Sequence, residues 1–340
     1  MSLYQKVGAN IINKSVTRFT VWAPLQKKIE LLLPEKNVVH PMEKDEFGYW
    51  NLSLNDCSAG VRYKYKLNGK KAYPDPASYF QPEGVHGSSQ VYDTSDFKWS
   101  DHNWINPELN EYIMYELHPG TFSDEENFQG ICNKLDYLVD LGINAVEITP
   151  VGQFPGKRNW GYDGTYPFAV QNSYGGPKEL QKLVNECHNK GIAVILDVIY
   201  NHLGPEGNYL GEFAPYFTQT YSTPWGPAIN FDDEYSFGTR NYFIQNALMW
   251  FRDFHIDALR LDAVHAIKDY GAKHFMLELT EYTNELSSIT GKSHYLIAES
   301  NLNDVRYINP VEKGGYQLDA QWSDDYHHAI HTKLTGDRFG

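Results

Sequence analysis

The chain has 340 residues, enough for a full hydrophobic core and for more than one domain. With 43 acidic against 29 basic side chains it carries a formal net charge of −14, which argues against a nucleic acid or an anionic membrane as its partner. Aromatic residues make up 15% of the chain, including 25 Tyr and 8 Trp, and exposed aromatic faces suit flat apolar surfaces such as sugar rings. A neutral ligand fits this composition better than a charged polymer.

The three cysteines, Cys57, Cys132 and Cys187, are odd in number and have no paired spacing, which is typical of a protein from a reducing compartment. Residues 1–8 contain no apolar core followed by a small-residue cleavage site. No run in the chain approaches the roughly 18 apolar residues that a membrane-spanning helix needs. We therefore expect a cytoplasmic protein without a membrane segment.

The first hundred residues have the pattern of β-structure. Short runs rich in branched and aromatic residues are separated by Pro, Gly, Asn and Asp, which favour turns; they cover residues 18–22, 28–33, 49–54 and 62–67. The pair Asn68-Gly69 is a strong hairpin signal. The pattern predicts an antiparallel β-sandwich domain over residues 1–105, with the polar segment 99–107 as the linker to the next domain.

From residue 106 to residue 340 the pattern changes to alternating strands and helices. Apolar runs predict strands at 113–116, 144–149, 192–199, 256–262, 294–298 and 317–321. Helical periodicity predicts helices at 128–141, from 177 to just before Gly191, at 239–255 and at 269–288. The long loops follow strands and never helices, which favours a TIM-type (β/α)8 barrel of the α/β class over a doubly wound sheet, with about six of its strands in this chain.

Acidic residues stand at the ends of three of these apolar strands: Asp197, Asp262 and Glu299. A buried strand has no packing use for a charge at its last position, because removing a carboxylate from water is costly unless a partner compensates it. The carboxyl ends of parallel strands are also where loops build the active site of a barrel. We therefore expect Asp262 and Glu299 to be catalytic.

The neighbours of these two acids suggest different roles for them. Arg260 and Asp262 lie two residues apart on one strand and point to the same face, so the guanidinium can hold Asp262 ionised, as a nucleophile requires. Glu299 closes an apolar strand with no cation beside it in the sequence, which suits a proton donor. Glycoside cleavage needs one carboxylate of each kind. The alternative is a structural Arg–carboxylate pair together with a helix-capping glutamate.

Three segments resemble signatures of the α-amylase superfamily, glycoside hydrolase family 13, and they occur in the family's order: residues 197–202, 259–265 and 297–300. The resemblance implies that Asp262 is the nucleophile, that Glu299 is the general acid and then the base, and that the anomeric configuration is retained. For such a reaction the two carboxyl groups are about 5 to 5.5 Å apart. The N-terminal sandwich would be the family's starch-binding-type or early-set domain, which is immunoglobulin-like.

The same resemblance implies roles for residues around the two acids. Tyr162 would stack on the sugar in the cleaved subsite, and His202 would hydrogen-bond to that sugar. Arg260 would orient Asp262, and Asp163 would brace Arg260. The remaining positions are His265, which would contact the substrate, and two residues that would support the site, Asp197 and Asn201.

The loops resemble a narrower group of the family, the members that release trehalose from malto-oligosyltrehalose by cleaving the α-1,4 bond next to the terminal trehalose; the matching segments are 159–170, 174–177, 201–209, 223–226 and 321–328. Trp225, Trp322 and Asp324 are candidates for contacts with that disaccharide, although a packing role is equally open for the two tryptophans. Glycogen branching enzymes share the domain order and the loop at residues 161–163, but they usually lack the extension at 204–209. A branching transglycosylase is therefore the alternative function.

A third possibility is a non-catalytic α-glucan-binding fragment, against which the presence of both Asp262 and Glu299 speaks. We expect no cofactor and no metal. The adjacent His327 and His328 would point about 100° apart on a helix, and no Asp-rich loop has the spacing of a calcium site. The sequence does not indicate an oligomeric state.

One part of the family pattern is absent from these 340 residues. The family has a third carboxylate, usually in an Asn-His-Asp motif near the seventh barrel strand, and no such motif occurs here. We expect the last quarter of the barrel to lie outside this chain, and the chain by itself to be poorly active. Losing such a charge typically lowers the rate on the order of 10² to 10³-fold.

Overall fold

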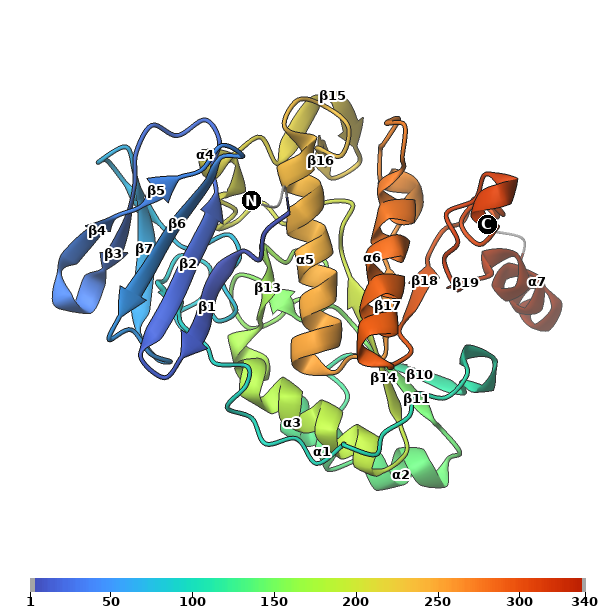
Figure 1. Ribbon diagram of the computed structural model, residues 1–340. Coiled ribbons are helices and arrows are strands. Elements are labelled where there is room, and N and C mark those ends of the chain that lie inside the picture. Colours follow the sequence, from blue (N-terminus) through green and yellow to red (C-terminus); the bar gives the residue numbers. More distant parts are fainter. Residues whose placement is uncertain (1–3, 338–340) are drawn as a thin grey trace.

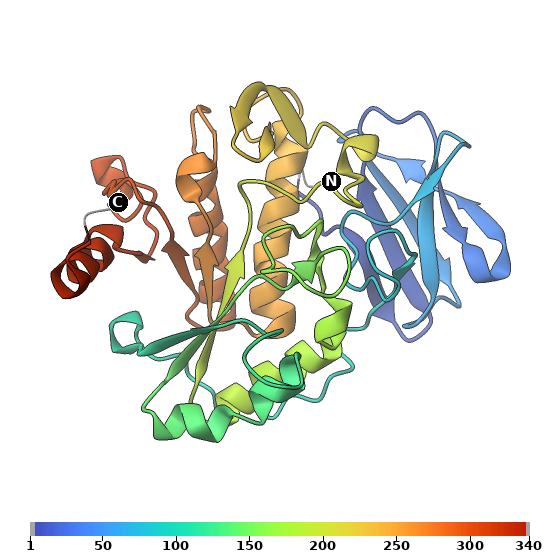
Figure 2. The same ribbon diagram turned by 180° about the vertical axis from the view of Figure 1, so that it is seen from behind.

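The computed structural model describes residues 4–337. An antiparallel β module lies on one side of the long helix α5, and the helix α7 lies on the opposite side, beyond a parallel sheet (Figures 1 and 2). The predicted fold class, a β-sandwich followed by part of a TIM-type barrel, is confirmed. Within the described residues, no helix is both long enough and apolar enough to cross a lipid bilayer.

The β module consists of two antiparallel sheets. One sheet has the order β1-β2-β6-β5, and the other has the order β4-β3-β7-β8, with β9 paired to β7. Phe19 on β2 and Tyr63 on β7 meet edge to face with their ring centroids 5.0 Å apart, so the two sheets share one apolar layer. The strand bounds are β1 Gly8–Asn13, β2 Val16–Trp22, β3 Ile29–Leu33, β4 Val38–Pro41, β5 Glu43–Lys44, β6 Tyr49–Asn55, β7 Arg62–Leu67, β8 Ala72–Tyr73 and β9 Ser89–Gln90.

The hairpin predicted at Asn68-Gly69 joins β7 to β8. Both residues have positive φ angles, 50° and 70°, as a type I′ turn requires. The four predicted strands are present, whereas β1, β4, β5, β8 and β9 were not predicted. β5, β8 and β9 have only two residues each, and β4 is largely exposed, so none of these four carries a clear alternating pattern.

The second part contains a six-stranded parallel sheet with its strands in chain order, β10-β11-β14-β17-β18-β19. This order, with a crossover after each strand, is the arrangement of a TIM barrel. The strand bounds are β10 Met114–Leu117, β11 Ala145–Ile148, β14 Ala193–Val198, β17 Ala258–Leu261, β18 Tyr295–Ala298 and β19 Ala320–Gln321. Two hairpins extend the loops after β11 and β14: β12 Gly152–Gln153 with β13 Tyr166–Val170, and β15 Phe217–Thr223 with β16 Gly226–Ile229.

The helices follow the strands as expected, and α5 and α6 lie side by side on one face of the sheet (Figure 1). Their bounds are α1 Phe128–Cys132, α2 Leu135–Asp140, α3 Gly176–Asn189, α4 Leu210–Phe213, α5 Ser236–Phe254, α6 Phe275–Thr290 and α7 Asp324–Thr335. The predicted helix 128–141 was wrong in that it is two short helices, and Leu141 is 55% exposed. Helix α6 begins six residues later than predicted, because Asp269 bends the chain back to accept a hydrogen bond from the Phe275 amide (2.5 Å).

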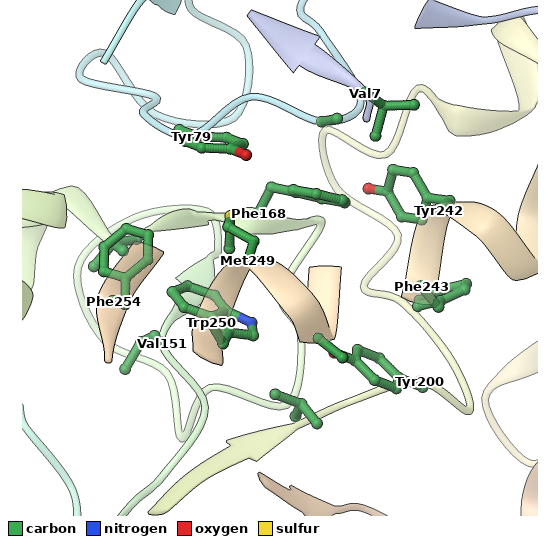
Figure 3. Packing of buried hydrophobic residues seen from close by; sticks show 14 of the residues in the cluster. Val7, Tyr79, Val151, Phe168, Tyr200, Tyr242, Phe243, Met249, Trp250 and Phe254 are labelled. Atoms are coloured by element: carbon green, nitrogen blue, oxygen red, sulfur yellow. The ribbon is translucent and has the colours of Figure 1, made fainter. Parts of the chain in front are cut away.

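The β module and the barrel share a continuous apolar contact along α5. Tyr79 stacks on Phe168 at 6.1 Å, and the Tyr242 hydroxyl donates to the Pro76 carbonyl oxygen (2.7 Å), as the packing around Val7, Tyr79, Phe168 and Tyr242 in Figure 3 illustrates. Trp22 packs directly on Gly238 of α5, where an added Cβ would lie 1.9 Å from the indole ring. The domain boundary at residues 105 and 106 stays a prediction.

The predicted linker is not a free connection, because it binds the amino-terminal end of the barrel. Trp104 stacks on His188 (4.5 Å) and donates its indole N–H to Asp257 (2.7 Å). His188 is buried and lies between two carboxylates, 2.8 Å from Asp101 and 2.9 Å from Asp257. Burial opposes its charge, but the hydrogen bonds to Asp101 and Asp257 raise the pKa of His188. This ionic cluster therefore fixes the linker to α3 and to the start of β17.

The loop that leads out of β14 rests on the β module. Tyr209 packs against Tyr73 with 5.1 Å between ring centroids, and its hydroxyl lies 2.7 Å from Nδ1 of His86. A few residues further on, Phe213 contacts Tyr73 with 6.2 Å between centroids. The extension at residues 204–209 is thus held from outside the barrel.

Candidate active site

Arg260 is the centre of the site. It lies on β17 two residues before Asp262, and alternation along the strand places both side chains on the same face. Nη1 of Arg260 donates to Asp262 Oδ1 at 2.8 Å and to both carboxylate oxygens of Asp197 at 3.0 and 2.9 Å. Burial opposes the charge of the guanidinium, but Asp197 and Asp262 raise the pKa of Arg260, which therefore remains a cation.

Asp262 is held through both of its carboxylate oxygens. Oδ1 accepts from Arg260, and Oδ2 accepts from the side-chain amide of Asn201 at 2.8 Å. The same amide also donates to the backbone carbonyl of Asp262 at 2.7 Å, so the end of the strand and its side chain are fixed together. The Asp262 side chain nevertheless keeps 12% exposure. Asn201 thus fixes Asp262, which is an oriented, accessible carboxylate.

Asp197 lies beneath this pair and is almost completely buried. Its side chain is 1% exposed and accepts a hydrogen bond from the Tyr162 hydroxyl at 2.9 Å in addition to the two from Arg260. Burial raises the pKa of Asp197, and the nearby Asp262 acts in the same direction, while Arg260 opposes them. Asp197 has almost no exposed surface and holds Arg260 and Tyr162 in place, and its role as a support of the site stays a prediction.

Glu299 stands at the end of the next strand, β18, and it is oriented by the backbone after Asp262. The Ala263 amide donates to Glu299 Oε2 at 2.7 Å, and the Val264 amide donates to the Glu299 carbonyl at 3.0 Å. Ala263 has φ 41°, a left-handed conformation that is uncommon for alanine and costs about 1 to 3 kcal/mol. This turn brings the two acidic strand ends together.

The sequence places no cation beside Glu299, but the fold does. Nη2 of Arg260 lies 3.7 Å from Glu299 Oε2, although no cation is close to Glu299 in the sequence. The neighbour comes from the adjacent parallel strand, where Arg260 pairs in register with Ile297. A single guanidinium therefore faces Asp197, Asp262 and Glu299.

Tyr162 is brought to the site by the loop after β11. Gly161, just before it, has φ 100°, and an added Cβ would lie 2.2 Å from the Pro150 carbonyl oxygen, so only glycine fits there. The Tyr162 hydroxyl reaches Asp197, which fixes the ring beside the acids. Burial, with the charge of Asp197, raises the pKa of Tyr162.

The expectation that Asp163 braces Arg260 is contradicted. Asp163 is exposed and accepts a hydrogen bond from the Asn159 side-chain amide at 2.8 Å, while Asp197 makes the bracing contact with Arg260. The physical reason is strand geometry. Asp197 is opposite Arg260 in the β14–β17 register, whereas Asp163 lies in a surface loop.

His202 is next to Asn201, but both of its ring nitrogens already have protein partners. Nε2 donates to the Tyr162 carbonyl at 2.9 Å, and Nδ1 pairs with the side-chain oxygen of Asn201. Burial lowers the pKa of His202. Its ring is stacked on Trp225 at 4.6 Å and 13°. A direct hydrogen bond from His202 to a sugar stays a prediction, and it would replace one of these contacts.

The three candidates for disaccharide contacts lie in two places. Trp322, which is 37% exposed, and Asp324 line a cavity of about 760 Å³ together with Arg260 and Glu299. Trp225 lies on the hairpin β15–β16 and is 50% exposed, with one ring face against His202. Within residues 4–337 neither tryptophan is buried, and the choice between disaccharide contact and packing stays open for both.

His265 belongs to a neighbouring cavity. It follows Asp262 by three residues and lines a space of about 480 Å³ together with Arg306, Tyr307 and Tyr316. Its Nδ1 atom is buried and has no hydrogen-bond partner within residues 4–337. A hydrogen bond from the Val264 amide to the Glu299 carbonyl oxygen connects the walls of the two cavities. Contact between His265 and a substrate stays a prediction.

One acidic residue of the site was missed. Glu147, on β11, is 2% exposed and lines the same cavity as Arg260 and Glu299. The signal was present, since a glutamate interrupts the apolar run Ala-Val-Glu-Ile and the criterion that selected Asp262 applies to it equally. It was overlooked because it stands one residue before the end of its strand.

The arrangement suits the cleavage of a carbon–oxygen bond by nucleophilic and general acid catalysis. It presents two carboxylates from neighbouring strands, one with donors on both oxygens and one with an oxygen toward an open cavity. Over residues 4–337, no group of three or more His, Cys, Asp or Glu side chains is arranged to hold a metal ion. Paired acids of this kind at the carboxyl ends of barrel strands are typical of glycoside hydrolases.

Comparison with known proteins relates the chain to a family. Residues 90–225 match the alpha amylase catalytic domain, and residues 6–82 match carbohydrate-binding module 48, the isoamylase N-terminal domain. A crystal structure of a Salmonella typhimurium protein described as an alpha amylase superimposes with a TM-score of 0.90 at 35% identity, covering 98% of this chain and 56% of that one. Over these residues the chain is similar to the α-amylase superfamily.

Among curated relatives, the malto-oligosyltrehalose trehalohydrolase of Saccharolobus solfataricus is 50% identical over 322 residues, which are 95% of this chain and 56% of that protein. The 1,4-alpha-glucan branching enzyme GlgB of Pseudoalteromonas atlantica is 27% identical over 383 residues, covering 96% of this chain and 52% of the enzyme. The chain thus spans little more than half the length of the curated relatives that it matches.

Proposed function

We propose that the protein is a retaining glycoside hydrolase that cleaves the α-1,4 bond next to the terminal trehalose of malto-oligosyltrehalose and releases trehalose. The observation that carries the proposal is the contact of one guanidinium, Arg260, with Asp262 at 2.8 Å and Glu299 at 3.7 Å. The choice of substrate is supported by the 50% identity to a malto-oligosyltrehalose trehalohydrolase over 95% of the chain.

In the proposed reaction Asp262 attacks the anomeric carbon while Glu299 gives its proton to the glycosidic oxygen. The bond to the leaving group breaks, trehalose departs, and the remaining glucan is covalently bound to Asp262. Glu299 then takes a proton from a water molecule, which attacks the same carbon and releases the glucan with its original configuration. Arg260 and Asn201 hold Asp262 in place for both steps.

The surrounding residues supply positions for the substrate. Tyr162 offers a ring beside the acids, and Trp322 and Asp324 line the cavity on the side of Glu299, where the protonated leaving group must lie. Trp225 presents one free ring face at the rim next to His202. Aromatic faces and a carboxylate are the groups that bind the apolar and hydroxylated faces of sugars.

Product analysis of the protein made from its complete gene tests the proposal. With malto-oligosyltrehalose we expect rapid release of trehalose, much slower cleavage of maltoheptaose and little change in amylose. Asp262→Asn should lower trehalose release by about 10³-fold or more, because it removes the nucleophile. Absence of trehalose among the products of the unaltered protein would contradict the proposed substrate.

A branching transglycosylase is the second candidate. The observation in its favour is the similarity of this chain to a glucan branching enzyme over 96% of the chain. The two functions differ in the acceptor, which is water for the hydrolase and a glucan hydroxyl for the transglycosylase. Debranching of amylose products after incubation would reveal new α-1,6 bonds only in the second case. A glucan-binding protein without catalysis would bind malto-oligosyltrehalose equally well before and after Asp262→Asn and would release nothing.

We also infer a cytoplasmic location. Its support is limited to the cysteines, because Cys57, Cys132 and Cys187 all have free thiols and two of them are buried. Such thiols are usual where glutathione keeps proteins reduced. Fractionation of cells that carry the natural gene, followed by immunodetection, tests the location, and recovery of the protein outside the cytoplasm would contradict it.

A further inference from the structure

Glu147 has an environment that the proposed reaction does not explain. Its side chain is buried on β11, and within residues 4–337 its Oε2 atom has no hydrogen-bond partner. A buried carboxyl oxygen without a partner destabilises the folded state, and more so if it is charged. A hydrophobic residue would avoid this cost at a position that served packing only.

The groups that face Glu147 are mostly acidic. Glu116 is opposite it in the β10–β11 register, and Asp197 lies on β14, the strand on its other side. Arg260 is the nearby cation, but its guanidinium already pairs with Asp197 and Asp262. The other charged or titratable side chains around the shared cavity are Glu299 on β18 and Asp324, Tyr326, His327 and His331 on α7.

We propose that Glu147 is a positioning residue that acts through the field around Arg260 on the ionisation of the Asp262 and Glu299 pair. The inference rests on the proposed function only in so far as these two acids are the reacting groups. Glu147 lines the same cavity as Arg260 and Glu299, and Arg260 in turn contacts both acids, so a charge on Glu147 acts on them through the guanidinium.

The direction of this effect follows from the charge. Burial raises the pKa of Glu147 to about 7, with Glu116 acting in the same direction and Arg260 opposing them. In its neutral form Glu147 does not compete for the charge of Arg260, which pairs with Asp197, Asp262 and Glu299. When it ionises, its negative charge makes the loss of a further proton from Glu299 harder. The proton donor then stays protonated to a higher pH than it would without Glu147.

The test is the pH dependence of kcat/KM, whose basic limb reports the loss of the essential proton from the free enzyme. Glu147→Gln keeps the shape of the side chain and removes its charge, and we expect the basic limb to move to lower pH by about half a unit or more. Glu147→Asp retains an ionisable group, so its basic limb should lie closer to that of the unaltered protein. Glu116→Gln, on the neighbouring strand but exposed, is the matched control and should shift the limb less.

A purely structural Glu147 would give a different result. Glu147→Gln would then lower kcat by the same factor at every pH, together with the melting temperature, and the limb would not move, which would overturn the inference. A shift of equal size in Glu116→Gln would also overturn it, because the effect would not be specific to Glu147. If Glu147→Gln does not fold, Glu147→Asp gives the answer. A basic limb at the same pH as in the unaltered protein, with full kcat, supports the inference, and a loss of kcat that is equal at every pH overturns it.

Failure of this inference can be told apart from failure of the proposed function. If the unaltered protein releases trehalose and the limb does not move, only the inference about Glu147 fails. If it cleaves maltoheptaose or branches amylose instead, the proposed substrate fails, and the same limb is measured on that reaction, which uses the same two acids. If none of these glucans is cleaved, both proposals fail.

Discussion

Asp197 and Arg260 are opposite each other in the register of β14 and β17, and Nη1 of Arg260 contacts both carboxylate oxygens of Asp197 at 3.0 and 2.9 Å. The buried acid Asp197 therefore fixes the guanidinium, which also contacts Asp262 and Glu299, the two proposed reacting acids. The orientation of Asp262, the proposed nucleophile, thus depends on a carboxylate that has almost no exposed surface.

Asp197→Asn tests this dependence. The change removes the charge that holds Arg260, and we expect kcat/KM to fall by about 10²-fold while the far-ultraviolet circular dichroism spectrum is unchanged. Asp163→Asn is the matched control, because Asp163 contacts Asn159 and not the guanidinium, and it should cost less than about tenfold. Equal losses in the two variants would show that Asp163 also supports the site.

Gly161→Ala should affect both stability and activity. The added methyl group would meet the Pro150 carbonyl oxygen at 2.2 Å in a left-handed conformation, so the loop must move and displace Tyr162. We expect a loss of about 1 to 3 kcal/mol in the free energy of unfolding and a lower kcat. Gly156→Ala, with φ 75° but no atom near its added Cβ, should cost only the backbone strain and leave kcat unchanged. Urea unfolding and initial rates measure the two quantities.

Trp322 and Trp225 should differ in their effect on the products. Trp322 shares a cavity with Glu299, on the side where the leaving group lies, so Trp322→Ala should raise KM for malto-oligosyltrehalose more than KM for maltoheptaose. Loss of one aromatic contact costs about 1 to 3 kcal/mol, which is roughly 5- to 160-fold. Trp225→Ala also removes the stacking on His202 and should lower kcat as well. An equal change in KM for both substrates in Trp322→Ala would contradict a role in choosing trehalose.

Asp75 makes the stability of the protein depend on pH. It is fully buried in the β module, where it accepts a hydrogen bond from the Tyr63 hydroxyl at 2.7 Å, and burial raises its pKa to about 7. The folded state therefore keeps a proton that the unfolded state loses near pH 4, so this contribution to stability is full below about pH 4 and declines as the pH rises to about 7.

The size of the change is on the order of 4 kcal/mol for a shift of about three units. Asp75→Asn cannot ionise. The unfolding free energy of the unaltered protein, relative to that of this variant, should therefore fall from pH 4.5 to pH 8. Urea denaturation at these two pH values measures it. A difference that is constant with pH would mean that Asp75 titrates normally in the folded protein.

The sequence could predict what depends on local pattern and on strand alternation. Arg260 and Asp262 share a face because they are two residues apart, and the acids mark the carboxyl ends of strands that are parallel. What the sequence could not supply was the lateral register. The choice of Asp197 and not Asp163 as the partner of Arg260, and the approach of Arg260 to Glu299, depend on how neighbouring strands are aligned, which no single strand encodes.

Other differences have local causes. Leu141 continues the helical periodicity of 128–141, but the chain has already turned by then, and Gly142 follows with φ 86°. The start of α6 was misplaced because the side chain of Asp269 competes for the Phe275 amide, a preference that periodicity does not contain. The polar pattern of the linker does not show its contacts, in which Trp104 and Asp101 bind histidines and an aspartate from distant parts of the chain.

The contact of Tyr209 with Tyr73 and His86 has a consequence for exchange between relatives. The loop that follows Asn201 and His202 packs on a module that precedes it by more than a hundred residues. The conformation of the loop therefore depends on that module. A chimera that receives a foreign β module while keeping its own loop would lose the support of that loop. Modules and loops should therefore be transplanted together when this scaffold is recombined.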